Sequence, residues 1–265
     1  MKIFISADIE GVCGVTHWDE ATKGKGDYLE FAHQMTFEVN AACEGANEAG
    51  AKEIVIKDAH DSARNIFHNM LPLNTKLIKG WSGSSYIMVQ ELDESYDALI
   101  YIGYHSAGGI DGNPLSHTLN SNLQYIKLNG EYASEFLIHS YIAAYHNVPV
   151  VFLSGDKVLC EEVKGIDKNI VTVAVKEGRG DSTINIHPKL AIDQIKEGVK
   201  SALSNDLSSY KINLPEKFEL EVKYKNHIAT TSKANYPNSE LVDSHTIRFS
   251  CNDYMEMLKA IAFIC

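Results

Sequence analysis

Two carboxylates, Asp8 and Glu10, directly follow the apolar run Ile3–Ile5 near the start of the chain. Carboxylates held this close repel each other, so one of them is driven to take up a proton unless a cation lies between them. Similar groups follow later apolar runs or begin a helix; they are Asp58, His60, His105, Glu135 and Asp156. Histidine and carboxylate ligands together suit zinc, manganese, cobalt or iron. The pattern therefore indicates a metal site, in which Asp8 could bridge two ions about 3.5–4 Å apart.

Each of these residues also has an ordinary structural explanation. Asp8 and Asp58 could accept hydrogen bonds in turns, and Glu135 in a first helical turn is favoured by the helix dipole. A single His60 or His105 is more often a hydrogen-bonded core residue than a ligand. The metal hypothesis therefore depends on the positions taken together.

The segment from His105 to His117 (HSAGGIDGNPLSH) is a Gly-rich loop with a histidine at each end. Such a loop could carry His117 over a site anchored by His105. An imidazole placed there can act as a general acid or base, or stabilise an oxyanion. The alternative is a surface connection whose glycines serve turns and whose His117 is exposed.

Four short runs rich in Val and Ile predict strands buried on both faces, as in a parallel sheet. They are Lys2–Ser6, Glu53–Lys57, Ala98–Gly103 and Pro149–Leu153. Apolar residues at helical spacing predict a helix between the first two, with Gly50 as its stop. Ligands of open α/β sheets bind beyond the carboxyl ends of the strands. The candidate residues fall at or just after those ends.

Later segments complete an α/β prediction: a mainly parallel central sheet flanked by helices, with a small C-terminal α+β subdomain. The core is residues 1–210, with strands at Leu123–Leu128 and Val171–Val175 and helices from about Ser134 and at Leu190–Leu203. Residues 211–265 form the subdomain packed on it, with strands at 218–225 and Thr246–Ser250 and a helix at Asp253–Ile264. The alternative is that this tail extends the main sheet.

Composition restricts the function and the compartment. The 265 residues carry a net charge of -11, which argues against nucleic acid and anionic membranes as partners. No apolar run approaches the roughly 18 residues of a membrane helix, and the N-terminus does not resemble a signal peptide. Five cysteines without a C-x-x-C pair favour a reducing, cytoplasmic compartment.

Several segments, in this order, resemble the DppA-type D-aminopeptidases, a family of dizinc metallopeptidases. They are SADIEG (6–11), KDAHDSARN (57–65), GYHSAG (103–108), PLSH (114–117), NGEYASE (129–135) and SGD (154–156). The resemblance implies two zinc ions per chain, with manganese, cobalt or iron as substitutes. It implies that Asp8 bridges the ions, that Glu10 and His105 complete one site, and that His60 and Glu135 complete the other. His117 matches the catalytic histidine of the family.

The chain departs from this family at two positions. Ser134 stands where relatives have glycine, and His139 stands where they tend to have asparagine. His139 lies one helical turn after Glu135, so it could be a supporting partner, an extra ligand or a plain buried polar residue, which we favour. Asp58 and Asp156 are the other candidates for orienting the ligands.

The expected function is metal-assisted hydrolysis of short peptides with a free amino terminus. The resemblance adds a preference for N-terminal D-amino acids such as D-Ala, and a homo-oligomer, possibly a decamer of two pentameric rings. Trp18 and Trp81 could serve such an interface or lie in the core. A dimetal phosphoesterase is the first alternative, although GWSGSS (80–85) lacks the lysine of a phosphate loop and follows no clear strand. A non-catalytic, metal-stabilised protein that binds peptides or amino acids is the second. A serine hydrolase is disfavoured because no G-x-S-x-G motif occurs.

Overall fold

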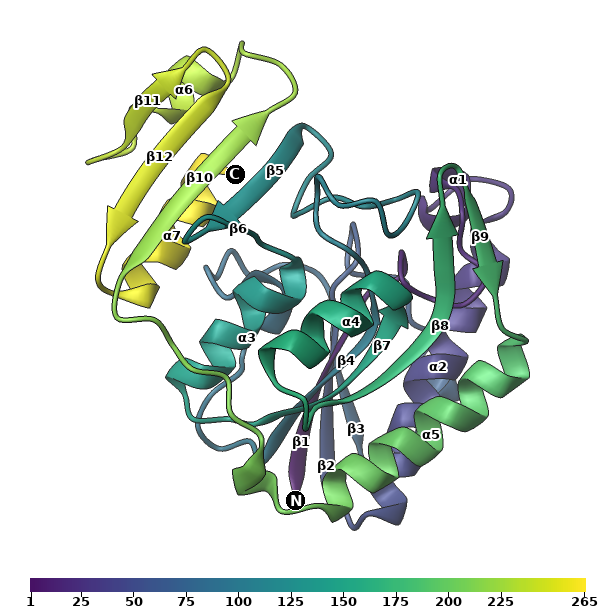
Figure 1. The fold of residues 1–265 in the computed structure, drawn as a ribbon. Coiled ribbons are helices and arrows are strands. Elements are labelled where there is room, and N and C mark those ends of the chain that lie inside the picture. The colour runs from purple at the N-terminus through teal and green to yellow at the C-terminus, as the bar shows by residue number, and fades with distance from the viewer.

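A seven-stranded sheet forms the centre of the computed structural model, which describes residues 1–265 (Figure 1). The strand order is β3-β2-β1-β4-β7-β8-β9, and all neighbours are parallel except β8 and β9. The strands are β1 (Lys2–Ala7), β2 (Glu53–Asp58), β3 (Thr75–Ile78), β4 (Ala98–Tyr104), β7 (Val150–Asp156), β8 (Val171–Arg179) and β9 (Ser182–Asn185). The predicted α/β class and its mainly parallel sheet are therefore confirmed.

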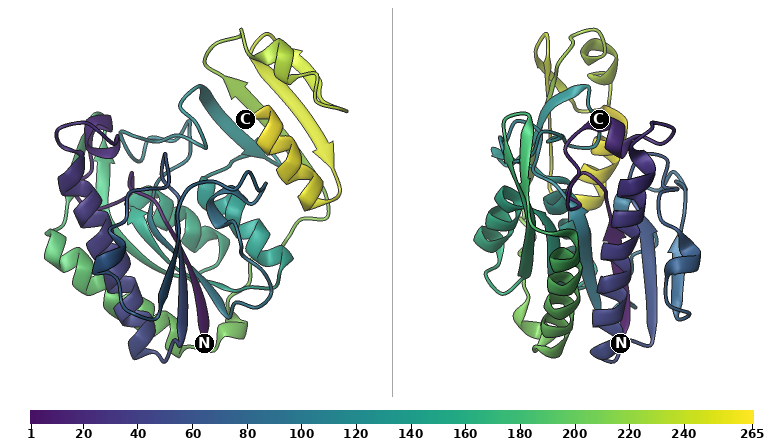
Figure 2. Two further views of the ribbon diagram at one scale, coloured as in Figure 1. Left: turned by 180° about the vertical axis from the view of Figure 1, so that it is seen from behind. Right: turned by 90° about the vertical axis from the view of Figure 1, so that its right-hand side faces the viewer.

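Helices cover both faces of this sheet, which explains why its central strands are apolar throughout. Every residue of β4 and β7 is buried. Figures 1 and 2 show α2 (Tyr28–Glu48) and α5 (Pro188–Ser204) together on one face, and α3 (Glu135–Tyr145) and α4 (Lys157–Ile166) on the other. A strand buried on both sides has no polar face, so its sequence reads as a continuous Val/Ile run.

The chain order reverses between β1 and β4, which lie side by side at the middle of the sheet. From β1 the chain builds outward through β2 and β3, and from β4 it builds the other way through β7 and β8. The loops that follow β1 and β4 therefore leave in opposite directions and open a space between them. Ligands of doubly wound sheets bind at this switch point.

A second, antiparallel sheet has the order β11-β12-β10-β5-β6. Its strands are β5 (Leu123–Leu128), β6 (Glu131–Tyr132), β10 (Phe218–Tyr224), β11 (Glu240–Asp243) and β12 (Thr246–Cys251), and α7 (Tyr254–Ile264) packs on it (Figure 2). Residues 211–265 thus do not extend the main sheet. Strands β5 and β6, from the middle of the chain, belong to the second sheet. One apolar core of 70 buried residues continues through both sheets. The proposed division near residue 211 stays a prediction.

The structure adds elements that the sequence analysis did not predict. They are β3, β6, β9, β11, the helices α1 (Trp18–Ala21), α4 and α6 (Thr230–Lys233), and the 3-10 turns His68–Met70, Ile87–Val89 and Leu207–Ser209. Because β3 ends at Ile78, the segment GWSGSS does follow a strand, and the contrary expectation was wrong. The β3 strand is only half-buried and its apolar signal is short, whereas α4 begins directly at the end of β7 and leaves no loop to mark it.

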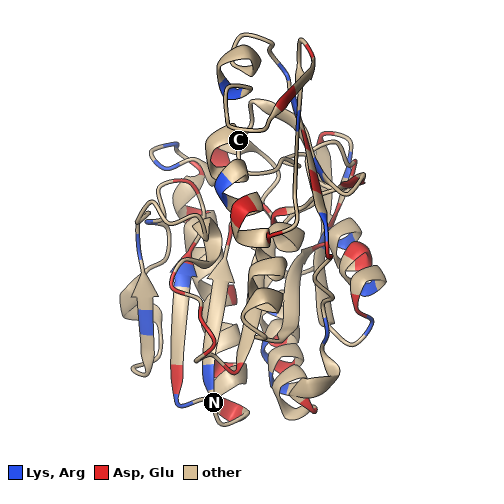
Figure 3. Cartoon of the chain, turned by 90° about the vertical axis from the view of Figure 1, so that its left-hand side faces the viewer, with Lys and Arg blue, Asp and Glu red and all other residues tan.

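Charged side chains are distributed over the surface, and Figure 3 shows acidic and basic residues interspersed along the chain. No helix of the protein is both long enough and apolar enough to cross a membrane.

Two helical glycines allow a test of the packing between α2 and α5. A Cβ atom on Gly45 in α2 would lie 2.3 Å from the carbonyl oxygen of Lys196 in α5, whereas one on Gly165 in α4 would meet nothing within 4 Å. We expect Gly45→Ala to lower the free energy of unfolding by about 1–3 kcal/mol, because the two helices must separate. Gly165→Ala should leave it unchanged or raise it by up to about 1 kcal/mol. Urea denaturation of both variants measures this, and equal stabilities would contradict the close packing.

Candidate metal centre

A cleft of about 450 Å³ opens at the carboxyl ends of the central strands. Five of the six residues predicted for metal binding and catalysis line it, and the sixth, His105, is buried beside them. The lining residues are Asp8, Glu10, His60, His117 and Glu135. They come from the loop after β1, the loop after β2, the loop after β4 and the first turn of α3. The structure therefore brings together residues that are up to 127 positions apart in the sequence, from Asp8 to Glu135.

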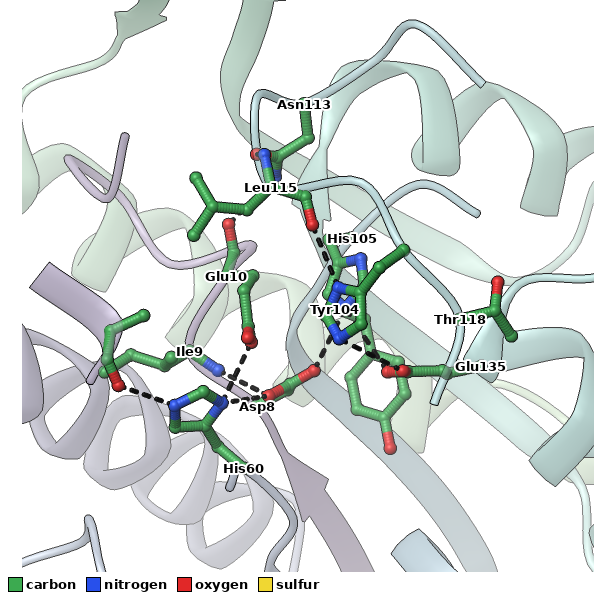
Figure 4. Close-up of polar contacts among 12 residues, drawn as sticks. Asp8, Ile9, Glu10, His60, Tyr104, His105, Asn113, Leu115, Thr118 and Glu135 are labelled. Atoms are coloured by element: carbon green, nitrogen blue, oxygen red, sulfur yellow. Dashed lines mark hydrogen bonds and ion pairs between the residues drawn. The ribbon is translucent and has the colours of Figure 1, made fainter. Parts of the chain in front are cut away.

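Asp8 lies at the centre of the group and faces a histidine with each of its carboxylate oxygens (Figure 4). Oδ1 is 3.3 Å from Nδ1 of His60, and Oδ2 is 3.5 Å from Nε2 of His105. The same His60 nitrogen is 3.1 Å from Oε2 of Glu10, and the same His105 nitrogen is 3.3 Å from Oε2 of Glu135. Asp8 thus joins two halves of one cluster, each with an imidazole and a second carboxylate.

These separations fit ligands that surround a common ion. Four ligand atoms placed tetrahedrally at about 2.0 Å from zinc lie about 3.3 Å from one another. Oε2 of Glu10 and Nε2 of His105 are buried and make no hydrogen bond, although both lie close to other polar atoms. Buried polar atoms are rarely left unpaired. The donor set and its unpaired atoms therefore suit a divalent metal.

The distances allow two different groupings of the metal-type residues, and Asp8 belongs to a group in each. The shortest contacts join His60 to Glu10 and His105 to Glu135. The atoms of Asp8, Glu10 and His105 also lie within 4.8 Å of one another, as the family resemblance implied for one site. The assignment of individual ligands to each ion stays a prediction.

Backbone carbonyl groups fix the orientation of all three imidazole rings. Nε2 of His60 lies 2.7 Å from the carbonyl oxygen of Ala21, and Nδ1 of His105 lies 3.0 Å from that of Ser106. Nδ1 of His117 lies 2.9 Å from the carbonyl oxygen of Leu115. Since a carbonyl accepts only, the facing nitrogen must carry a hydrogen, and the other nitrogen of each ring is left toward the cleft. Such outer contacts set the ligand nitrogen in metal sites.

Electrostatics in the cluster favours added positive charge. Burial, together with repulsion by Glu10, raises the pKa of Asp8 to about 6. Burial opposes the charged form of His60 and His105, yet the neighbouring carboxylates raise the pKa of both rings well above the usual value. Against the effect of burial, His105 lowers the pKa of Glu135 to about 2. The positive charge of the protonated imidazoles thus stabilises three buried carboxylates, and divalent ions can supply that positive charge instead.

Glycines allow the two central strand ends to approach closely. A Cβ atom on Gly11 would lie 1.8 Å from the carbonyl oxygen of Tyr104, and one on Gly103 would lie 2.3 Å from that of Asp8. The amide of Gly11 donates to the carbonyl of Gly103 over 2.8 Å. Gly103 also has φ of 69°, a conformation that side chains disfavour. The glycines of SADIEG and GYHSAG therefore let Asp8 and His105 meet.

Asp58 and Asp156, predicted to support the ligands, play equivalent parts at the ends of β2 and β7. Asp58 accepts hydrogen bonds from the backbone amides of Asn65 and Ile66, and so closes the loop that carries His60. Asp156 accepts from the amide and the hydroxyl of Ser106, both over 2.6 Å, directly after His105. Each aspartate is fully buried and touches the loop, not the cleft.

The two departures from the family lie on either side of Glu135. Ser134 begins α3, accepts from the amide of Leu137 and donates to Glu162 over 2.8 Å. His139 is fully buried, with Nδ1 2.6 Å from the carbonyl oxygen of Glu135, and burial lowers its pKa to about 4. A neutral His139 that is hydrogen-bonded to the backbone agrees with the expectation of a plain buried polar residue.

His117 lies above the cluster and is more exposed than the ligands. Its ring stacks on His105, with centroids 4.5 Å apart, and Nε2 is 3.7 Å from Oε1 of Glu135. The side chain is 13% exposed, against 4% for Glu135 and none for His105. Nε2 is near enough to His105 and Glu135 to join a metal site. Its partial exposure places it where a substrate would lie.

Sequence reasoning missed three parts of the site. Lys176 and Asn113 both donate to the carbonyl of Glu10 and hold its turn in place. Trp18 and Trp81 line the cleft, although they were considered only for the core or a subunit interface. Lys176 is recognisable afterwards as a buried lysine directly after the Val-rich run Val171–Val175 of β8. Trp18 begins the four-residue helix α1 and Trp81 lies in a loop, and neither carries such a signal.

Comparison with known proteins agrees with this fold and site. The sequence model of a peptidase family described as D-aminopeptidase matches residues 1–263. A D-aminopeptidase of Bacillus subtilis (strain 168) is 26% identical over 98% of this chain and 95% of its own length. A solved structure, described as the Zn-dependent D-aminopeptidase DppA from Bacillus subtilis, a self-compartmentalizing protease, shares the fold with a TM-score of 0.92. It is 24% identical, over 100% of this chain and 96% of its own.

An α/β protein with metal-type residues clustered at its switch point is thereby placed among the peptidases. The chain belongs to the D-aminopeptidase family, as the resemblance of its motifs predicted.

Asp58 offers a test of how the His60 loop supports the cluster. Asp58 accepts from the amides of Asn65 and Ile66 with one oxygen and from the side-chain amide of Asn65 with the other, so in Asp58→Asn the new NH₂ group must face a donor in either orientation and the loop must rearrange. We expect affinity for Zn²⁺ to fall about 10- to 100-fold, measured by competition with a chromogenic chelator. Asp206→Asn is the control, because Asp206 accepts a backbone hydrogen bond in the same way but at an exposed turn. Unchanged affinity in Asp58→Asn would show that this bonding does not position His60.

Proposed function

We propose that this protein is an aminopeptidase that hydrolyses short peptides with N-terminal D-amino acids at a dinuclear zinc site. The observation that carries the proposal is the cluster in which Asp8 faces one imidazole with each carboxylate oxygen. A carboxylate with both oxygens engaged in this way is suited to bridge two ions. Membership of the D-aminopeptidase family supports the reaction class.

Asp8, Glu10, His60, His105 and Glu135 would hold the two zinc ions. When bound, zinc lowers the pKa of water toward neutrality and polarises a carbonyl group, which supplies a nucleophile and an electrophile for hydrolysis. The chain itself contributes the fixed directions of these side chains and the cleft that most of them line.

His117 would act as the proton carrier. Its Nδ1 hydrogen is committed to the carbonyl of Leu115, so proton exchange takes place at Nε2, which faces the cleft. From there Nε2 can stabilise the negative oxygen of a tetrahedral intermediate, or give a proton to the leaving amine. Stacking on His105 keeps the ring in this position.

The cleft favours a peptide over a phosphate ester. No lysine or arginine lines it, whereas four of its lining residues are carboxylates: Asp8, Glu10, Asp61 and Glu135. Asp8, Glu10 and Glu135 would hold zinc, so Asp61 is the carboxylate left to pair with the positively charged amino terminus of a peptide, and no lysine or arginine is present to bind a phosphate group. The dimetal phosphoesterase is therefore the weaker alternative. A binding protein without turnover is distinguished by the activity assay below.

A closed homo-oligomer, possibly a decamer of two pentameric rings, is also part of the proposal. The solved relative is described as self-compartmentalizing. Exposed apolar side chains in β11, α7 and the segment after β10 are available for subunit contacts; they are Ile228, Leu241, Val242 and Phe263. A cytoplasmic location is supported by the five cysteines, all of which are free.

Metal content is the direct test of the dinuclear site. We expect about two zinc ions per chain in the purified protein by elemental analysis, and loss of both in Asp8→Ala, because this residue serves both halves of the cluster. Asp193→Ala, at an exposed ion pair on α5, should retain both ions. A protein that takes up no zinc, even when zinc is added, would end the proposal.

Peptide assays test the reaction and the role of His117. We expect hydrolysis of D-Ala-D-Ala and little hydrolysis of L-Ala-L-Ala. In His117→Ala, kcat should fall about 10²- to 10⁴-fold while zinc content stays the same, since proton transfer is lost but the ligands remain. Exposed His187 at the start of α5 provides the control, and His187→Ala should keep full activity. Full activity in His117→Ala would exclude it as the proton carrier, and zinc binding without any turnover would favour the binding-protein alternative.

A further inference from the structure

Both tryptophans of the chain, Trp18 and Trp81, line the single cleft that holds the metal-type cluster. They are 38% and 42% exposed. Large aromatic rings normally gain by burial, so an exposed ring beside a reactive cleft is available to contact a ligand. The chain has no other tryptophan, and the metal cluster does not explain why two exposed rings lie in its cleft.

A buried lysine ammonium and a hydrogen bond from the indole N–H hold the Trp81 ring in position. The ammonium group of Lys57, which is fully buried in β2, lies 3.9 Å from the centre of the Trp81 ring and covers one face. The same ammonium donates to the carbonyl of Gly80 over 2.6 Å, and the indole N–H donates to the carbonyl of Asp61 over 2.7 Å. Contact with a buried cation strengthens the attraction and fixes the plane of the ring. The exposed part of Trp81 is therefore a rigid apolar surface.

Trp18 is held on the side of His117. It begins α1, and its ring meets the His117 ring edge to face, with centroids 5.4 Å apart. The helix start is fixed because Glu20 accepts hydrogen bonds from the amides of Thr16 and His17. Trp18 therefore keeps one position relative to the proposed proton carrier.

We propose that Trp18 and Trp81 determine specificity, and that the cleft selects short peptides with aromatic or bulky apolar side chains next to the scissile bond. This inference rests on the proposed peptidase function. His117 protonates the leaving amine in that function, so Trp18 contacts the second residue of the substrate. Trp81 donates a hydrogen bond to the carbonyl of Asp61, the residue after His60, and contacts the amino-terminal residue of the substrate. Ile87, Met88 and Leu119 add apolar lining within the same cleft.

Three dipeptides test the assignment on the zinc-loaded protein: D-Ala-D-Ala, D-Phe-D-Ala and D-Ala-D-Phe. We expect kcat/KM to be about 3- to 10-fold higher for each phenylalanine peptide than for D-Ala-D-Ala, the ratio that one aromatic contact supplies. Trp81→Leu should abolish the preference for phenylalanine at the first residue only. Trp18→Leu should abolish it at the second residue only. Phe37→Leu changes a ring of equal exposure on α2, outside the cleft, and should keep both preferences.

Fluorescence gives a second measurement that does not depend on turnover. Each single variant retains one tryptophan, so its emission reports on that ring alone. Saturable quenching of Trp81 by D-Phe-D-Ala and of Trp18 by D-Ala-D-Phe, with none by D-Ala-D-Ala, supports the proposal even if no peptide is cleaved. Equal kcat/KM for all three dipeptides, unchanged in the variants, overturns the specificity role and leaves the peptidase function intact. Absence of turnover overturns the peptidase function, and absence of quenching overturns the role of the tryptophans.

Discussion

Repulsion among three buried carboxylates is the constraint on which the rest of this structure depends. Asp8, Glu10 and Glu135 are brought together at the switch point of the sheet, where water is largely excluded. Burying one charge is costly, and burying three of the same sign is tolerated only with positive charge between them. His60 and His105 provide some of it. A cluster built in this way gives up part of the stability of the apoprotein and gains a strong preference for divalent cations.

The fold supplies this arrangement from backbone geometry more than from side-chain contacts. Parallel strands end at one edge of the sheet, so residues that follow separate strands meet without any long connection. Carbonyl groups orient the rings, and Asp58 and Asp156 fix the loops after β2 and β4 by accepting hydrogen bonds from backbone amides. Glycines at 11 and 103 remove the side chains that would keep β1 and β4 apart. The reactive residues are thus placed by rigid elements whose own sequences are mostly apolar.

The sequence predicted the parts of the molecule that local patterns determine. Buried strands such as β1 and β4 appear in the sequence as continuous apolar runs. The residues directly after each run therefore lie at the carboxyl end of that strand. The second sheet was not predictable in the same way, because β5 and β10 are paired through tertiary contact across about ninety residues of chain. The short, half-buried β3 lacks a distinct apolar pattern. Trp81 reaches the cleft from an irregular loop and Trp18 from the four-residue helix α1, and no periodicity in the sequence encodes either position.

The second sheet has a consequence for how the protein matures. Between His117 and β5, the side chain of Asn120 donates to the carbonyl of Cys265, at the end of α7, over 2.9 Å. Asn120 also lines the cleft. During synthesis the residues of the cluster emerge long before this anchor exists. The wall of the cleft is completed only when α7 has left the ribosome, so a nascent chain carries the residues of the cluster before the cleft around them is finished.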